Sequence, residues 1–327
     1  MVLPRQHIEQ RGIGASEIAA ALGLNPYKTP LELWLEKTGQ APGFSGNSRT
    51  EWGLDVEPAL RTWYVRRHDL AVWVPSGSLF HDVHPWMRAT PDGIALREIG
   101  GQAPAWDHGF EAKNIGRHSA HRWGEPGTDQ VPMEYLLQAQ QGMAVTGLSR
   151  WVIVACIAGD PPAEYPIERD DDLIAQMVEG GQAFMRLVEH GIEPEVDGSP
   201  AWAEYLAEKY PHASEDYAVP TIEDEKRIAS LRDVRRAIRD LESMESELEN
   251  HLKQRIGARA GIDSAVGRIT WKPQRGRELV DWESIAVNLA QHAGISDRDL
   301  NARIAANTRS AKPSRPFNVP RSWSEKR

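Results

Sequence analysis

The chain has 327 residues, of which 40% are apolar and 26% charged, a composition that suits a globular protein and excludes a chain too polar to build a core. We expect no membrane span, because no run of 18 apolar residues occurs, and no secretory signal, because the first residues lack an apolar core. The net charge of −9 is uneven: residues 1–150 carry −2, residues 151–225 carry −15 and residues 226–327 carry +8, so a DNA partner is not excluded.

The first predicted elements in chain order are helices. Ser16 is expected to cap a short helix over residues 16–22, and Thr29 with Pro30 begins a second helix that ends at Lys37. A long amphipathic helix is predicted over residues 48–68. Its apolar stripe consists of Trp52, Val56, Leu60, Trp63 and Tyr64.

Strands follow these helices. They are predicted near residues 78–81, over 87–96 with an interruption at Pro91-Asp92-Gly93, and over 108–113. A helix over 133–146 leads to the continuous apolar run 151–157, which is typical of a strand buried on both faces. This order of elements predicts an α/β unit that ends near residue 168.

The rest of the chain is predicted to be mostly helical. The expected helices cover residues 170–190, 223–256, 281–292 and 296–306, with an irregular stretch over 194–220 and a strand pair near 264–272. The apolar seam of the helix over 223–256 indicates a partner helix or a coiled-coil arm. We therefore divide the chain into four parts. Residues 1–195 form an α/β domain and residues 196–222 an acidic irregular connector. Residues 223–307 form a helical extension, and residues 308–327 a basic tail without fixed structure.

Cys156 is the only cysteine of the chain. It excludes disulfides and any zinc or iron–sulfur site that needs several cysteines of one chain. A reduced, cytoplasmic compartment suits this composition.

The strongest chemical signal is Thr90-Pro91-Asp92-Gly93, followed 19 residues after Asp92 by Glu111-Ala112-Lys113. Residues two apart in a strand project from the same face, so Glu111 and Lys113 point into one space. Two carboxylates brought together there repel each other unless a divalent cation joins them, and hard oxygen ligands favour Mg²⁺ or Mn²⁺. Such a cation activates water and stabilises charge on a scissile phosphate, which predicts a nuclease. Taken separately, Asp-Gly is a common turn and Glu-x-Lys a common exposed ion pair.

Five blocks in this order resemble the PD-(D/E)xK nucleases, and among them the YqaJ-type viral recombinase proteins related to phage lambda exonuclease. The blocks are Arg11 to Glu17, Trp52-Gly53 with Glu57-Pro58, Thr90 to Gly93, Glu111-x-Lys113, and Tyr135-x2-Gln138-x-Gln140. The resemblance implies an α/β fold in which helices flank a mixed central sheet, with a helical C-terminal extension. Residues 1–195 would then be the nuclease domain.

The resemblance also implies roles for individual residues. Asp92, Glu111 and the backbone carbonyl of Ala112 would hold a metal ion, and Glu57 would support a second one. Gln138 would position Lys113 or the attacking water. Arg11 and Ser16 would bind the 5′ phosphate of a DNA end, although Ser16 can also be a plain helix cap and the charge of Glu17 beside a phosphate is unfavourable.

The expected activity is Mg²⁺- or Mn²⁺-dependent digestion of double-stranded DNA ends, 5′ to 3′, in phage-type recombination with a single-strand annealing protein. The resemblance places such a protein in a bacterial host cell, encoded by a phage or prophage, and implies a ring of three subunits. Two alternatives remain: a structure- or sequence-selective endonuclease of the same superfamily, and a DNA-binding recombination scaffold without catalysis. The sequence leaves polarity, processivity, oligomeric state, the annealing partner and the role of the basic extension open.

Overall fold

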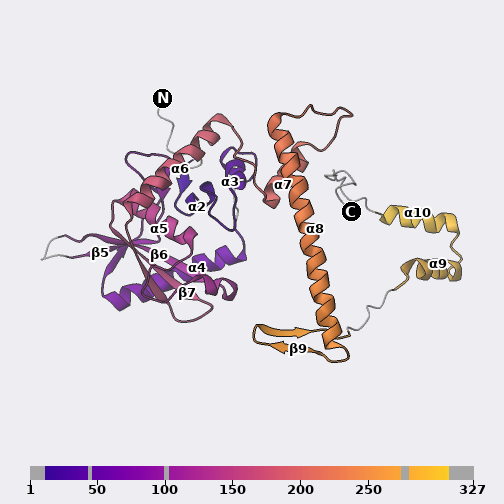
Figure 1. Ribbon diagram of the computed structural model, residues 1–327. Helices are drawn as coiled ribbons and strands as arrows, with labels where there is room; N and C mark the ends of the chain where they lie inside the picture. Colours follow the sequence, from indigo (N-terminus) through magenta and orange to yellow (C-terminus); the bar gives the residue numbers. More distant parts are fainter. Residues whose placement is uncertain (1–11, 43–45, 99–102, 274–279, 309–327) are drawn as a thin grey trace. The chain divides into compact units, whose positions relative to one another are not determined.

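The computed structural model describes residues 12–42, 46–98, 103–273 and 280–308. The chain divides into two compact units, residues 1–206 and 207–327, and the division falls inside the helix α7, Pro200–Lys209 (Figure 1). Within the described ranges, no helix is long and apolar enough to cross a membrane.

The first unit is built on a five-stranded mixed sheet with the order β2-β5-β6-β7-β8. The central pair β6 and β7 is parallel, with Glu111 beside Ile153, and the other neighbours are antiparallel. The strands are β2 (Ala71–Trp73), β5 (Gly93–Arg97), β6 (Ala105–Ile115), β7 (Arg150–Ile157) and β8 (Ala163–Glu168).

Each face of this sheet is covered by a helix. On one face, α4 (Ser48–His68) packs Leu60 and Tyr64 against Phe110, Val152 and Val154. On the other face, α5 (Met133–Thr146) contributes a second buried cluster that includes Ala139, Met143, Trp151, Ile153 and Ala155. Alternate residues of β7 therefore enter two different cores, which confirms the prediction of a strand buried on both faces.

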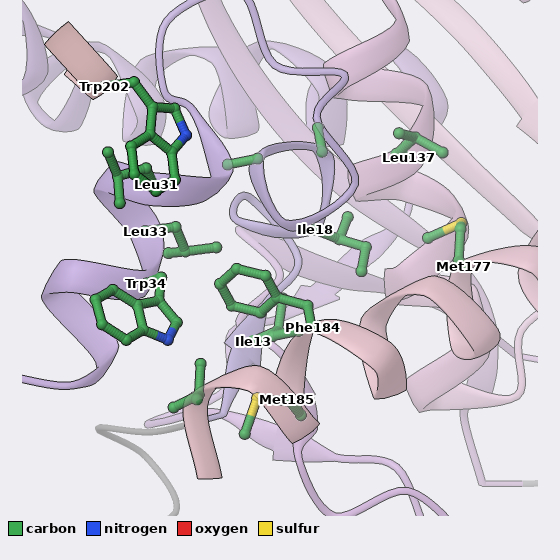
Figure 2. Packing of buried hydrophobic residues seen from close by; sticks show 13 residues of the cluster. Ile13, Ile18, Leu31, Leu33, Trp34, Leu137, Met177, Phe184, Met185 and Trp202 are labelled. Atoms are coloured by element: carbon green, nitrogen blue, oxygen red, sulfur yellow. The ribbon is translucent and has the colours of Figure 1, made fainter. Parts of the chain in front are cut away.

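A second, smaller sheet has the order β1-β4-β3, formed by Ile13–Gly14, Met87–Ala89 and Leu79–Phe80. Residues of α2 (Ile18–Ala21), α3 (Pro30–Lys37) and α6 (Asp171–His190) pack against this sheet. The 3₁₀ turn η1 (Arg117–Arg122) follows β6, and its Arg122 pairs with Glu134 of α5. The helix α3 begins with a capping box in which Thr29 and Glu32 satisfy each other's backbone N–H groups. Figure 2 shows how α2, α3, α5 and α6 bury one apolar cluster, which includes Ile18, Leu33, Trp34, Met177 and Phe184.

Most predicted elements are confirmed within a few residues, including both helices that cover the sheet. Strands β1, β2 and β8 have no counterpart among the predicted strands, and three further details are wrong. Ser16 does not cap a helix, because Glu17 occupies the N-cap position of the single-turn α2. The segment expected to be irregular contains α7, which forms because Trp202 is buried in the cluster of Figure 2. Trp52 is 60% exposed, since it lies one turn before the part of α4 that packs on the sheet.

The second unit contains one long helix, α8 (Ile222–Ile256), which begins with a capping box between Thr221 and Asp224. It also contains the hairpin of β9 (Gly261–Ser264) and β10 (Gly267–Thr270), followed by α9 (Trp282–His292) and α10 (Asp297–Asn307). The predicted basic tail, residues 308–327, lies outside the described residues apart from Thr308.

Candidate active site

The structure brings Asp92, Glu111 and Lys113 together at the start of β5 and the middle of β6. Gly93 pairs with Phe110, so Asp92 lies just before the point where the two strands meet. The Asp92 carboxylate accepts a hydrogen bond of 2.8 Å from the backbone N–H of Ala112, between the other two residues. The strand alternation predicted from the sequence therefore positions the three side chains around one backbone contact.

Glu111 is the buried centre of this group, with 5% of its surface exposed. Its oxygen Oε1 accepts a hydrogen bond of 2.8 Å from Lys113 Nζ and a second one from the side-chain amide of Gln138 in α5. Within the described residues no donor reaches the other oxygen, Oε2. One oxygen is thus held in place while the other remains able to take a ligand.

The site holds two carboxylates, Asp92 and Glu111, and one ammonium, Lys113, which are largely shielded from water. Burial raises the pKa of Asp92 to about 8, and the charge of Glu111 adds to the rise. Burial alone would lower the pKa of Lys113, but Glu111 and Asp92 outweigh it, so this pKa is raised and the ammonium stays protonated at neutral pH. An ionised Asp92 therefore needs a positive partner beyond Lys113.

Glu57 reaches the group indirectly through Arg61 of the same helix. Arg61 forms an ion pair of 3.0 Å with Glu57 and donates a hydrogen bond of 2.8 Å to the backbone carbonyl of Asp92. The charge of Glu57 is close enough to contribute to the raised pKa of Asp92. The Glu57 carboxylate is nevertheless already paired with the guanidinium of Arg61.

The residues present fit a magnesium-type ion. Carboxylates from Asp92 and Glu111, with the carbonyl of Ala112 as a third oxygen, form the hard donor set that Mg²⁺ prefers. No group of three or more His, Cys, Asp or Glu side chains with metal-binding geometry occurs in the described part of the chain. An ion held here would keep several waters, which Mg²⁺ commonly does and which a water-activating site requires.

The proposed phosphate contacts are only partly described. Arg11 lies outside the described residues. Ser16 is exposed in the turn between β1 and α2, and no described hydrogen bond links it to Asp92 or Glu111. The neighbouring Glu17 is turned inward, where its carboxylate accepts hydrogen bonds of 2.7 Å from Lys37 Nζ and from the Gly14 N–H. Its negative charge is thus largely neutralised within the fold.

Three residues to which the sequence assigned no role contact the site or hold its elements in place. Arg61 lies one helical turn after Glu57, a spacing that signals an ion pair but not the bond to Asp92. Tyr135 places its ring 5.1 Å from Lys113 Nζ in a cation–π contact. Gln141 is fully buried and donates to the carbonyls of Ile13 and Arg88, which fastens α5 to β1 and β4. Gln140, by contrast, bonds the backbone of Glu168 and Asp170.

Comparisons with known proteins identify relatives of this chain. Residues 6–149 match the family described as YqaJ-like viral recombinase domain. The protein YqaJ of Bacillus subtilis (strain 168) is 30% identical over 255 residues, which cover 76% of each chain. The protein R354 of Acanthamoeba polyphaga mimivirus is 26% identical over 156 residues, covering 46% of this chain and 28% of the relative.

Two solved structures are similar at lower identity. An alkaline exonuclease from Laribacter hongkongensis has a TM-score of 0.45 at 22% identity, covering 63% of this chain and 97% of its own. A phage-related exonuclease from Haemophilus somnus 129PT has a TM-score of 0.40 at 13% identity, covering 55% and 95%. The match to YqaJ extends over three quarters of both proteins, well beyond the matched domain. The chain belongs to the family of YqaJ-like viral recombinases.

Proposed function

We propose that the chain is a divalent-metal-dependent deoxyribonuclease that digests double-stranded DNA from its ends in phage-type recombination. The observation that carries the proposal is the convergence of Asp92, Glu111 and Lys113 around the Ala112 N–H, with Gln138 fixing one oxygen of Glu111. A carboxylate pair with an adjacent ammonium suits hydrolysis of a phosphodiester, in which water adds to phosphorus as one P–O bond breaks.

Each residue has a distinct part in this proposal. Asp92 and Glu111 supply the oxygens that hold Mg²⁺ or Mn²⁺, together with the Ala112 carbonyl. A bound ion of this kind lowers the pKa of a water ligand and offsets the charge that develops on the phosphate. Lys113 stays protonated, held by Glu111 and Tyr135, and offers its ammonium to the phosphate or to the attacking water. Arg61 fixes the backbone of Asp92, and Glu57 supports a second ion once Arg61 releases it.

Recognition of the end is proposed to involve Arg11 and Ser16, which would bind a 5′ phosphate and set a 5′ to 3′ direction. The products would be 3′ single strands for a single-strand annealing protein in the cytoplasm of the bacterial host. A ring of three subunits around the duplex would keep an acidic chain on its substrate. Oligomeric state is tested by sedimentation with and without DNA.

The most informative experiment compares linear duplex DNA with closed-circular DNA, each in Mg²⁺ and in EDTA. We expect Mg²⁺-dependent digestion of the linear substrate only. Cleavage of the circle would favour the endonuclease, and binding without cleavage of either substrate would favour the scaffold.

A comparison of linear DNA that carries a 5′ phosphate with linear DNA that carries a 5′ hydroxyl then tests whether the protein recognises the terminal phosphate. A charge-assisted contact contributes roughly 1.5–3 kcal/mol, so the hydroxyl substrate is expected to be at least about tenfold slower.

The site assignment needs a matched pair of variants. Asp92→Asn preserves the size of the side chain and an acceptor for the Ala112 N–H, but it removes the charge that would hold the ion. We expect cleavage to fall below detection while the circular dichroism spectrum is unchanged. Asp82→Asn makes the same chemical change at an exposed carboxylate and should retain full activity. Near-native cleavage by Asp92→Asn would show that this carboxylate does not hold the metal.

A further inference from the structure

The long helix α8 exposes an apolar seam along most of its length. The seam has a residue at every third or fourth position, and all of these from Val234 to Leu252 are apolar except Glu245. The apolar members are 37–63% exposed: Val234, Ile238, Leu241, Leu248 and Leu252. Ile238, Leu241, Leu248 and Leu252 line a shallow groove together with Met244 and the carboxylates of Glu242, Glu245 and Glu249. A seam with this spacing is the geometry that two helices use to pack side by side.

The charges of α8 are divided sharply along its axis. Between Lys226 and Arg239 there are six basic residues and one acidic residue, a net charge of +5. Between Asp240 and Glu249 there are five acidic residues and no basic one, a net charge of −5. The helix is therefore basic on one side of the 239–240 boundary and acidic on the other.

We propose that α8 is a self-association surface that pairs antiparallel with α8 of a second copy of this chain, crossing at residues 239 and 240. Because a two-fold contact of this kind cannot close a ring of three, the second copy lies outside the ring proposed above, and α8 would join one ring to another. In this arrangement residue i lies opposite residue 479 − i, so each basic segment faces the acidic segment of the second copy. Ile238 then packs on Leu241 and Leu231 on Leu248, each twice by symmetry. Arg235 lies beside Glu242 of the second copy, again twice.

A parallel pair in register is disfavoured by the same charges. It would place the two basic segments together, the two acidic segments together, and Glu245 of the seam opposite its own copy. In the antiparallel pair Glu245 faces Val234, with Arg235 next to it. The charge pattern thus selects the direction as well as the partner.

Label distances in the full-length protein test the direction. Ser243→Cys and Asn250→Cys, each in a Cys156→Ser background, place a spin label one heptad apart on the outer face of α8 without changing its charge. In the antiparallel pair the two copies of label 243 are offset by about 10 Å along the axis and those of label 250 by about 31 Å. Equal distances at both sites would indicate a parallel pair, and no measurable coupling at either site would show that α8 does not self-associate. Either result overturns the proposal.

A charge swap tests the pairing by sedimentation of the full chain. Arg235→Glu and Glu242→Arg should each weaken self-association roughly tenfold or more, because two attractive contacts become repulsive. The double variant restores both contacts and should recover the wild-type affinity. Arg236→Glu is the control, since it makes the same change on the outer face and should leave association unchanged. If the double variant is no better than the single variants, the pairing is wrong. The swap lies outside the nuclease site, so loss of pairing with DNA cleavage retained leaves the proposed function unaffected.

Discussion

The substitution Gly142→Ala tests how closely α5 packs on the sheet. A Cβ atom at Gly142 would lie 2.4, 2.7 and 2.8 Å from three carbon atoms of the Trp151 indole, and ordinary contact begins near 3.4 Å. The indole cannot move toward the sheet, because it already lies against the backbone of Gly109. The contact is so close that a Cβ atom added at Gly109 would lie 2.0 Å from the ring. Trp151 is therefore enclosed between two glycines, one in α5 and one in β6.

The expected magnitude follows from two opposing effects. Overpacking a well-filled core destabilises a protein by about 1–3 kcal/mol, and the enclosed position of Trp151 places this case at the upper end. Replacing Gly by Ala inside a helix returns about 1 kcal/mol. The net loss is about 2 kcal/mol, which lowers the midpoint of thermal unfolding by about 4–8 °C for a unit of this size.

Gly53→Ala in α4 is the matched control. It is the same substitution inside another helix of the same unit, but no atom lies within 4 Å of the added Cβ. Only the helix-propensity effect remains, so the midpoint should rise by about 2–4 °C. Tryptophan fluorescence follows the unfolding, since nine of the twelve tryptophans lie in residues 1–206.

If Gly142→Ala is as stable as the wild type, the added methyl group does not clash with Trp151. A second variant tests whether the loss of stability comes from the clash with Trp151 or from any substitution at this position of α5. Trp151→Phe removes the ring that the added methyl group would meet, so Gly142→Ala should cost much less in that background. A coupling free energy below about 0.5 kcal/mol in this double-mutant cycle would show that the two residues do not touch.

Three further outcomes follow from the site and its surroundings. Ca²⁺ should support DNA binding but not cleavage, because it polarises its bound water less than Mg²⁺ does; turnover in Ca²⁺ alone would contradict the metal mechanism. Gln138→Leu should lower cleavage about 10- to 100-fold with unchanged stability, the usual effect of removing a residue that orients a ligand, and wild-type rates would refute its positioning role. Glu17→Gln should destabilise the protein by about 3 kcal/mol at pH 7, because it leaves Lys37 buried without its partner. Urea titrations should show this difference shrinking as the pH falls below 4.5, and a constant difference would argue against an ionised Glu17.

The sign of that pH dependence depends on the two partners together. Burial alone would raise the pKa of Glu17, but Lys37 and the Gly14 N–H outweigh it, so the pKa is lowered. An acid with a lowered pKa contributes stability above its unfolded value of 4.5, and this contribution is lost as the pH falls through the folded pKa. The pKa of Lys37 is also lowered, because burial outweighs its attraction to Glu17. The pair therefore adds little net stability but is costly to break.

The parts of the fold that the sequence predicts well are those with local signals. Thr29 and Pro30 mark the start of α3, and the apolar run of β7 has no polar interruption. The spacing of Glu111 and Lys113 places both on one face of a strand, and the structure has them in hydrogen-bond contact. These features depend on residues close together in the chain.

The parts that escape prediction depend on distant partners. The helix α7 is short and lies among breakers, and Trp202 becomes an anchor only because α3 and α6 form the cluster it enters. Arg61 reaches the Asp92 carbonyl across 31 residues, and Gln141 reaches Ile13 across 128. Neither side chain carries a local sign of its partner.

The pairing of β6 with β7 has a consequence for how much of the chain makes a stable nuclease. The recognisable domain ends at residue 149, one residue before β7 begins. A fragment that stopped there would leave β6 with an open edge from Gly109 to Ile115, the stretch that holds Glu111 and Lys113. It would also leave an empty slot where Trp151 sits between Gly109 and Gly142. Bare strand edges of this kind recruit other chains, so such a fragment is expected to aggregate, and the smallest soluble piece must continue through β8 and α6.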